Sequence, residues 1–270
     1  MPYGAIKKEF LSKGQIEDIL NIADPDFITA IDTSPDYGDA ETILGQCFWN
    51  RDIATKIVFR DESKICLEKK LRQSMDRLRV DKLDIVFVHN WDDLNQIQKT
   101  SVYKSLKEMK TIGVIRDIGI STYSLIEIKT ILSSKVRDIV VQFNMNILDQ
   151  RVRELDSEEW RNKLLECKIR LWGRSIFLQG ILINSSSNNP FYDHPDLKSF
   201  WEYCLLTESN PYDLCVSYPR QLGYVDAIVV GINSEIEMQE IVSCIKKPPL
   251  NVHFPSFAST DQFLVDPRRW

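Results

Sequence analysis

Five polar side chains in this sequence stand at the ends of short apolar runs, and together they could carry acid–base chemistry. They are Asp32, Lys56, His89, Ser121 and Gln142. A carboxylate, an ammonium group and an imidazole can hold or transfer protons when their surroundings shift their pKa values. Because polar residues at the ends of different parallel strands meet at one edge of the sheet, we expect these five to share a site.

A metal centre is an alternative use of the same residues. His89 is one of three histidines, and Asp32 with the run Asn90-Trp91-Asp92-Asp93 could supply oxygen ligands. No second histidine stands at another strand end to complete a three-ligand set. We therefore expect no metal, and a metal-dependent hydrolase is the weaker hypothesis.

Seven runs rich in β-branched residues predict the strands that would position these side chains. Their nearly continuous apolar character indicates strands buried on both faces, as in a parallel sheet covered by helices. The predicted strands cover residues 27–32, 52–59, 82–89, 115–121, 138–143, 168–177 and 226–231.

Helical signals fall between these runs. A 3.6-residue apolar period covers 65–80, capping boxes begin at Ser124 and Ser234, and a first helix at 15–23 has no strand before it. Alternating strands and helices predict βαβ units. No GxGxxG motif follows an early strand, so we expect a (β/α)8 TIM barrel rather than a Rossmann fold, with residues 1–270 forming one domain.

Composition excludes several classes of protein. The 270 residues are 43% hydrophobic and 27% charged, with a formal net charge of -5, which is typical of a globular protein and offers no positive field for nucleic acid. No apolar run is long enough to span a membrane. The six scattered cysteines include no CxxC pair, which favours reduced thiols in the cytoplasm.

The residues after the first predicted strand resemble the signature of the aldo-keto reductases. Ile31-Asp32-Thr33-Ser34-Pro35-Asp36-Tyr37-Gly38 precedes Glu41 and Leu44-Gly45 at the spacing of that family. The resemblance continues in the family's order over nearly the whole chain, in segments 55–56, 83–89, 113–121, 141–146, 174–180 and 230–234. The family begins with a strand that ends just before a segment like residues 1–4, so the resemblance implies a barrel that lacks its first strand.

The resemblance implies a catalytic tetrad of Asp32, Tyr37, Lys56 and His89. Reduction of a carbonyl needs a hydride on carbon and a proton on oxygen, and an adjacent ammonium lowers the pKa of a phenol. Tyr37 is then the general acid, Lys56 lowers its pKa, Asp32 keeps the buried lysine charged, and His89 orients the carbonyl oxygen. Taken singly, each of these residues is more often structural.

For the cofactor, the resemblance implies NADP(H), with NAD(H) as the alternative. The matching positions are at four strand ends: Ser121, Thr122, Gln142, Arg174, Ser175, Gly231, Asn233 and Ser234. Thr122 replaces an asparagine of the family, and Arg174 replaces an aromatic ring that stacks on the nicotinamide. The segment 231–238 contains two acids and no cation, which argues against binding of a 2′-phosphate.

We therefore predict an NAD(P)H-dependent oxidoreductase that reduces an aldehyde, a ketone or a keto-sugar. The alternative is a catalytically impaired nucleotide-binding barrel that acts as a regulatory or interaction subunit. A sugar or nucleotide-sugar is the suggested substrate, and oligomeric state stays open. Four aromatic residues could form a substrate platform, although packing is an equal explanation for each: Trp91, Tyr123, Phe191 and Tyr192.

Overall fold

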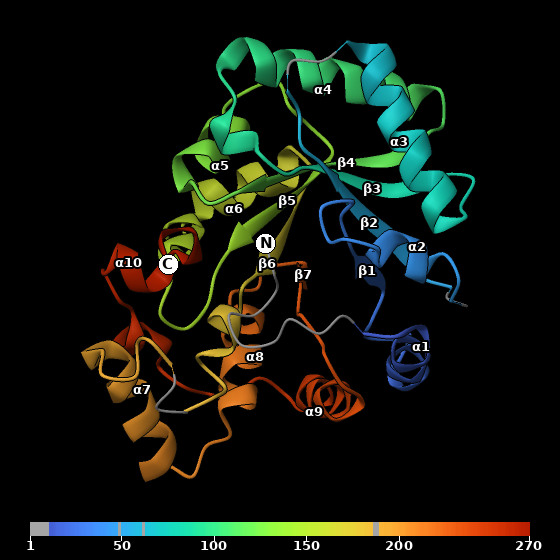
Figure 1. The fold of residues 1–270 in the computed structure, drawn as a ribbon. Coiled ribbons are helices and arrows are strands. Elements are labelled where there is room, and N and C mark those ends of the chain that lie inside the picture. The colour runs from blue at the N-terminus through green and yellow to red at the C-terminus, as the bar shows by residue number, and fades with distance from the viewer. Residues whose placement is uncertain (1–10, 48–49, 61–62, 186–188) are drawn as a thin grey trace.

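The computed structural model describes residues 11–47, 50–60, 63–185 and 189–270. In these residues seven parallel strands form one sheet in sequence order, and the sheet curls as Figure 1 shows. The strands are β1 (Ala30–Asp32), β2 (Asp52–Ile57), β3 (Leu83–Val88), β4 (Ile115–Thr122), β5 (Ile139–Asn144), β6 (Ile169–Arg174) and β7 (Ala227–Ile228).

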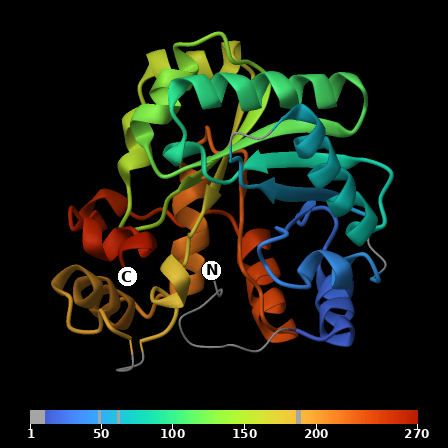
Figure 2. The ribbon, with the colours of Figure 1, turned by 45° about the horizontal axis from the view of Figure 1, so that its top comes forward.

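Apart from the first helix, which precedes β1, the helices follow the strands, and several of them cover the outer face of the sheet (Figures 1 and 2). The α-helices are α1 (Lys13–Ile22), α2 (Ala40–Leu44), α3 (Lys64–Leu78), α4 (Gln96–Thr111), α5 (Leu125–Leu132), α6 (Glu158–Glu166), α7 (Pro195–Leu206), α8 (Pro211–Gln221), α9 (Glu235–Lys246) and α10 (Gln262–Val265). Short 3₁₀ turns are η1 (Trp91–Asp93), η2 (Arg151–Leu155), η3 (Leu178–Gly180), η4 (Phe254–Phe257) and η5 (Pro267–Arg269).

The described residues form a (β/α)8 barrel in which one strand is lacking. Within the described residues, β1 pairs only with β2, and β7 pairs only with β6. The position predicted for the missing strand, next to residues 1–4, lies outside the described residues. The predicted fold class is confirmed.

The helix layer continues where the two edge strands are not paired with each other. Helices α1 and α9 lie side by side in both views (Figures 1 and 2) and bury Ile19, Ala23 and Met238 between them. Asp24 and Lys246 form an ion pair of 2.9 Å across the same contact. The outer ring therefore joins the first and last parts of the sheet.

The barrel interior is filled by large side chains packed against glycine. Phe87 and Trp172 place their ring centroids 5.8 Å apart, in a cluster with three other buried residues. A Cβ atom on Gly119 would lie 2.3 Å from Phe87 Cδ1, so any larger residue there would force the phenyl ring to shift. The much larger apolar core lies between the sheet and the helices.

All seven predicted strands exist, but some predicted ends were wrong. Phe27 and Ile28 both donate backbone hydrogen bonds to Asp24, so they form a turn before β1. Strand β6 stops at Arg174 because Ser175 has a left-handed backbone with φ 59°. The helix caps at Ser124 and Ser234 form as predicted through side-chain acceptance from Glu127 and Glu237 amides.

The return hydrogen bond of each capping box, from the cap amide to the glutamate carboxylate, was predicted wrongly. The Glu127 carboxylate binds Trp91 Nε1 at 3.1 Å instead of returning to its own cap. The Glu237 carboxylate accepts from the Asn233 amide rather than from that of Ser234.

Candidate active site

A buried ion pair forms the centre of the predicted tetrad. Lys56 of β2 donates through Nζ to Asp32 Oδ2 at the end of β1, and to the Thr33 carbonyl at 2.9 Å. The side chains of Lys56 and Asp32 are 3% and 10% exposed. Gln142 of β5 donates from Nε2 to the other Asp32 oxygen at 2.8 Å. The sheet thus brings three of the predicted residues together from three strands.

Burial lowers the pKa of Lys56, because a charged ammonium is poorly solvated there. The ion pair with Asp32 opposes this effect, and the charge of Arg174 adds to it. The positive charge of Lys56 is therefore disfavoured by burial and stabilised by one carboxylate. Such a group can stabilise a neighbouring anion and can release its proton more easily than a surface lysine.

Tyr37 approaches this ion pair from the turn between β1 and α2. Lys56 Nζ lies 5.1 Å from the centroid of the Tyr37 ring. The turn is closed by a hydrogen bond of 3.0 Å from the Tyr37 amide to the Ser34 carbonyl, and Gly38 supplies a left-handed residue with φ 61°. The local sequence therefore holds the phenol beside the ammonium.

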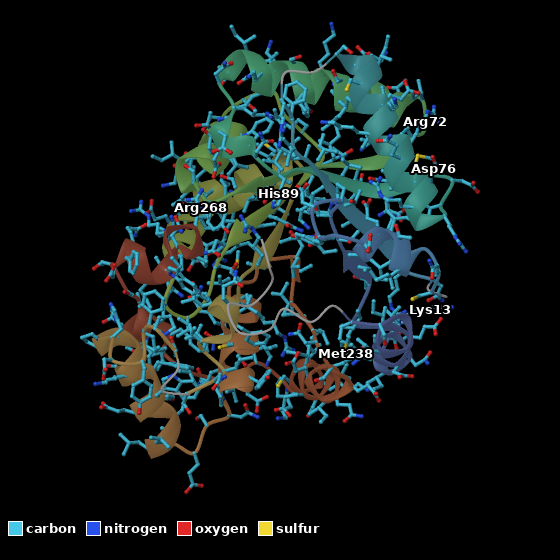
Figure 3. The ribbon with its side chains drawn as sticks, in the orientation of Figure 1. Lys13, Arg72, Asp76, His89, Met238 and Arg268 are labelled. Carbon is cyan, nitrogen blue, oxygen red and sulfur yellow. The ribbon has the colours of Figure 1, made fainter. Side chains whose placement is uncertain are left out.

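His89 follows β3 and completes the predicted set. Its amide donates to the Ile57 carbonyl at 2.8 Å, which continues the ladder between β2 and β3. Its Nδ1 lies 3.9 Å from Asp36 Oδ2, and Figure 3 labels the half-buried side chain. Burial lowers the pKa of His89, and the charges of Lys56 and Arg174 lower it further. A neutral imidazole can donate one hydrogen bond to a bound oxygen.

The metal alternative gains no support from side-chain placement. In the part of the chain that the structure describes, no group of three or more His, Cys, Asp and Glu side chains could hold an ion. Asp92, which that alternative would use, accepts from the Thr122 hydroxyl and from the Tyr123 amide.

Of the two predicted cofactor residues that end β4, only Ser121 keeps its hydroxyl available. Ser121 makes no side-chain hydrogen bond to another described residue. The Thr122 hydroxyl donates to Asp92 and accepts from the Ser124 amide at 2.9 Å, so it is part of the loop scaffold.

At the end of β6, the Arg174 guanidinium stacks on the Tyr123 ring, with its Cζ atom 4.0 Å from the centroid. The carbonyl of Ser175 accepts from Asn146 Nδ2 at 3.3 Å, which fixes the start of the following loop. Arg174 therefore lies at the same end of the sheet as Lys56 and His89, whose pKa values its charge lowers.

The remaining predicted cofactor residues, Gly231, Asn233 and Ser234, lie in the turn from β7 to α9. Asn233 donates its amide to the Glu237 carboxylate at 2.6 Å, and Ser234 Oγ accepts from the Glu237 amide at 3.2 Å. A carboxylate of the chain therefore already occupies a place where a phosphate of a ligand could bind.

Sequence reasoning missed two features of this region. Arg268, near the end of the chain, stacks on the second face of Tyr123 with Cζ 3.8 Å from the ring centroid (labelled in Figure 3). The Thr33 carbonyl, one residue beyond the tetrad aspartate, binds Lys56. No periodicity or motif marks Arg268, whereas Thr33 lies within the signature itself.

Two residues of the suggested aromatic platform serve packing instead. Trp91 is buried and donates to Glu127. Phe191 is buried against the rings of Phe263 and Trp270, with centroid distances of 5.7 and 4.9 Å.

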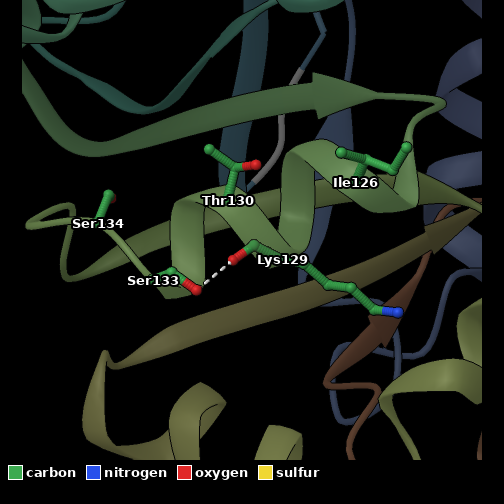
Figure 4. A pocket seen from close by; sticks show the side chains of 5 residues that line it. All are labelled: Ile126, Lys129, Thr130, Ser133 and Ser134. Carbon is green, nitrogen blue, oxygen red and sulfur yellow. Dashed lines mark hydrogen bonds between the residues drawn. The ribbon is translucent and has the colours of Figure 1, made fainter.

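Two surface hollows lie on the described part of the molecule, one along α5 and one beside the turn that carries Tyr37. Figure 4 shows one along α5, lined by Ile126, Lys129, Thr130, Ser133 and Ser134, none of which belongs to the tetrad. The other is lined in part by Pro35, Asp36 and Ile57, next to the turn that carries Tyr37. None of the helices within the described ranges is long and apolar enough to cross a bilayer.

Comparison with known proteins identifies the family of the chain. The profile of the Aldo/keto reductase family matches residues 4–253. D-arabinose 1-dehydrogenase of Saccharomyces cerevisiae is 33% identical over 258 residues, which cover 83% of this chain and 74% of that protein. Methylglyoxal reductase DkgB of Yersinia pestis is 32% identical over 210 residues, covering 72% of this chain and 69% of the other.

Solved structures share the fold at lower identity. Aldo-keto reductase AKR11C1 from Bacillus halodurans has a TM-score of 0.73 and 22% identity, covering 96% of this chain and 89% of its own. The Bombyx mori aldo-keto reductase AKR2E4, solved in complex with NADP, has a TM-score of 0.70 and 16% identity, and the match covers 99% of this chain and 90% of that protein.

The fold and the matched relatives define an oxidoreductase built on a (β/α)8 barrel. The chain belongs to the Aldo/keto reductase family.

Proposed function

We propose that this protein reduces a carbonyl group to an alcohol with a reduced nicotinamide dinucleotide, and that Tyr37 is the general acid. The observation that carries the proposal is the position of the Tyr37 ring, 5.1 Å from the ammonium of a lysine that is 3% exposed and paired with Asp32. A buried ammonium stabilises the phenolate that remains after Tyr37 gives up its proton.

Each residue of the tetrad then has a defined task. The Tyr37 hydroxyl donates a proton to the carbonyl oxygen, and solvent later returns a proton to the phenolate. Lys56 stabilises the phenolate, while Asp32 and the Thr33 carbonyl hold Lys56 in place. His89, whose pKa is lowered, is a neutral hydrogen-bond donor that orients the carbonyl.

The nicotinamide end of the cofactor fits the residues at the ends of β4 and β5. A carboxamide needs a donor for its oxygen and an acceptor for its NH₂ group. The Ser121 hydroxyl and Gln142 Oε1 make no hydrogen bond to other described side chains and could meet both needs. When bound there, the reduced dinucleotide would supply the hydride for the carbonyl carbon.

We propose NADPH as the reductant, because the Bombyx mori aldo-keto reductase of the same fold was solved with NADP, and NADH is the alternative. The Glu237 carboxylate at the start of α9 would repel a 2′-phosphate and favours acceptance of NADH. For the substrate, the name of the yeast relative adds support to a sugar. We also propose the cytoplasm as the compartment, since none of the six cysteines, all of which lie in the described residues, forms a disulfide.

The test is to titrate NADPH and NADH by protein fluorescence and then to assay aldehyde reduction by wild type and by Tyr37→Phe. The proposal requires nucleotide binding in both proteins and turnover that depends on Tyr37. Absence of nucleotide binding would overturn it.

The second candidate is a nucleotide-binding barrel with little turnover, which acts as a regulatory subunit. The engaged Thr122 hydroxyl and the Glu237 carboxylate at the expected phosphate position favour it. Tight binding of NADPH without Tyr37-dependent turnover would select this candidate.

A further inference from the structure

Tyr123 lies between two guanidinium groups whose surroundings differ. Arg174 and Arg268 place their Cζ atoms 4.0 and 3.8 Å from its ring centroid. Arg268 is neutralised by Asp266 at 2.7 Å, with Asp92 at 3.7 Å. Arg174 forms no ion pair with any carboxylate of the described residues, and its Nε is buried without a hydrogen-bond partner.

The stack orients the Arg174 side chain, and its N–H groups make no hydrogen bond to another described residue. A guanidinium that stacks through its face still directs its N–H groups outward in one plane, which suits a carboxylate or a phosphate oxygen pair. Tyr123 is itself held in position, because its amide donates to Asp92 at 2.8 Å and its carbonyl accepts from Arg151 at 3.1 Å.

The uncompensated charge is close to the tetrad. Arg174 ends β6, where it pairs in register with Asn144, two residues beyond the Gln142 that binds Asp32. Its charge lowers the pKa values of both Lys56 and His89, the groups that flank the expected carbonyl. The phosphates of a dinucleotide are separated from the nicotinamide by a ribose, so an anion bound by Arg174 at the end of β6 belongs more naturally to the substrate.

We propose that Arg174 is a specificity-determining residue that binds an anionic group of the substrate, a carboxylate or a phosphate, while the carbonyl faces Tyr37. The substrate class is therefore a carbonyl compound with a negative charge on the same molecule. This inference rests on the proposed reductase function. Arg174 itself moves no proton in the reaction, and Tyr123 with Arg268 acts as its support.

The test compares aldehydes that differ in charge. We would measure the reduction of two pairs of aldehydes by wild type, Arg174→Gln and Arg174→Lys. The charged and neutral members are 4-oxobutanoate and butanal in one pair, and 4-carboxybenzaldehyde and benzaldehyde in the other. We expect wild type to prefer the charged member of a pair in kcat/KM, and Arg174→Gln to lose about ten- to hundredfold on it, as for a charged hydrogen bond. Removal of the Arg174 charge also acts on Lys56 and His89, and this effect should be the same for both members of a pair. The ratio of kcat/KM for the charged aldehyde to that for the neutral one should therefore fall in Arg174→Gln, and Arg174→Lys should recover part of it.

The control is Arg72→Gln, because Arg72 is half exposed on α3 and pairs only with Glu68 of the same helix among the described residues. It should match wild type on every aldehyde. Equal loss on charged and neutral aldehydes with weaker NADPH binding would assign Arg174 to the cofactor or the fold and overturn the proposal. Circular dichroism identifies a variant that has not folded, and Arg174→Lys then carries the comparison.

A binding measurement separates this proposal from the reductase function. Calorimetry with 4-hydroxybutanoate, in the presence of NADPH, needs no turnover. Binding to wild type that is lost in Arg174→Gln supports the anion site even if Tyr37-dependent reduction is not found. If aldehydes are reduced with no effect of charge and 4-hydroxybutanoate binds both proteins equally, the reductase function stands and the anion site is rejected.

Discussion

Removal of Lys56 tests whether the tetrad is organised around one buried charge pair. In Lys56→Met the carboxylate of Asp32, which is 10% exposed, keeps only the hydrogen bond from Gln142 among its described side-chain partners. A buried ion left without its counter-ion typically costs about 3–5 kcal/mol of unfolding free energy. We expect a loss of that size, measured by urea denaturation followed through tryptophan fluorescence.

The double variant Asp32→Asn/Lys56→Met tests whether the two charges are coupled. Replacing both charges removes the uncompensated carboxylate, so the double variant should be more stable than Lys56→Met alone. Lys64→Met is the control, because Lys64 forms an exposed pair with Glu108 and should leave the denaturation midpoint nearly unchanged. If the double variant loses as much unfolding free energy as Asp32→Asn and Lys56→Met lose together, the two side chains are not coupled and the buried pair is refuted.

Three other predictions follow from the described contacts. Because burial lowers the pKa of His89 below its usual 6.5, the unfolded chain binds more protons as pH falls through 6.5. The free energy of unfolding should therefore decrease below that pH. The urea midpoint of His89→Gln should change less steeply with pH than that of wild type, and an equal pH dependence in the two proteins would contradict this. Gly119→Ala should cost about 1–3 kcal/mol, since its Cβ would lie 2.3 Å from Phe87, whereas Gly14→Ala in α1, with open space around it, should not destabilise. Glu237→Gln should raise the affinity for NADPH relative to NADH in fluorescence titrations, and an unchanged ratio would place the 2′-phosphate elsewhere.

Much of the architecture could be predicted because parallel buried strands leave a clear apolar pattern. The same rule placed Asp32, Lys56 and Gln142 at one edge of the sheet, where they make contact. The ends of strands were harder to predict. Strand β6 ends where Ser175 adopts a left-handed backbone, and no residue type in 168–177 indicates that change.

Contacts between distant segments were beyond sequence reasoning. Glu127 follows the local pattern of a capping box, yet its carboxylate binds Trp91 and Lys99 because those partners are held beside it by the fold. The stack of Arg268 on Tyr123 depends in the same way on how the C-terminal turn η5 packs. Such pairs carry no periodicity, so only the structure reveals them.

The role of Tyr37 is tested most directly in a single turnover. Enzyme is in excess over aldehyde, and NADPH carries deuterium at its reactive position. We expect wild type to transfer deuterium to the carbonyl carbon, and Tyr37→Phe to bind NADPH equally well but to transfer deuterium at least about hundredfold more slowly. Undiminished transfer by Tyr37→Phe would contradict the assignment of Tyr37 as the proton donor beside Lys56.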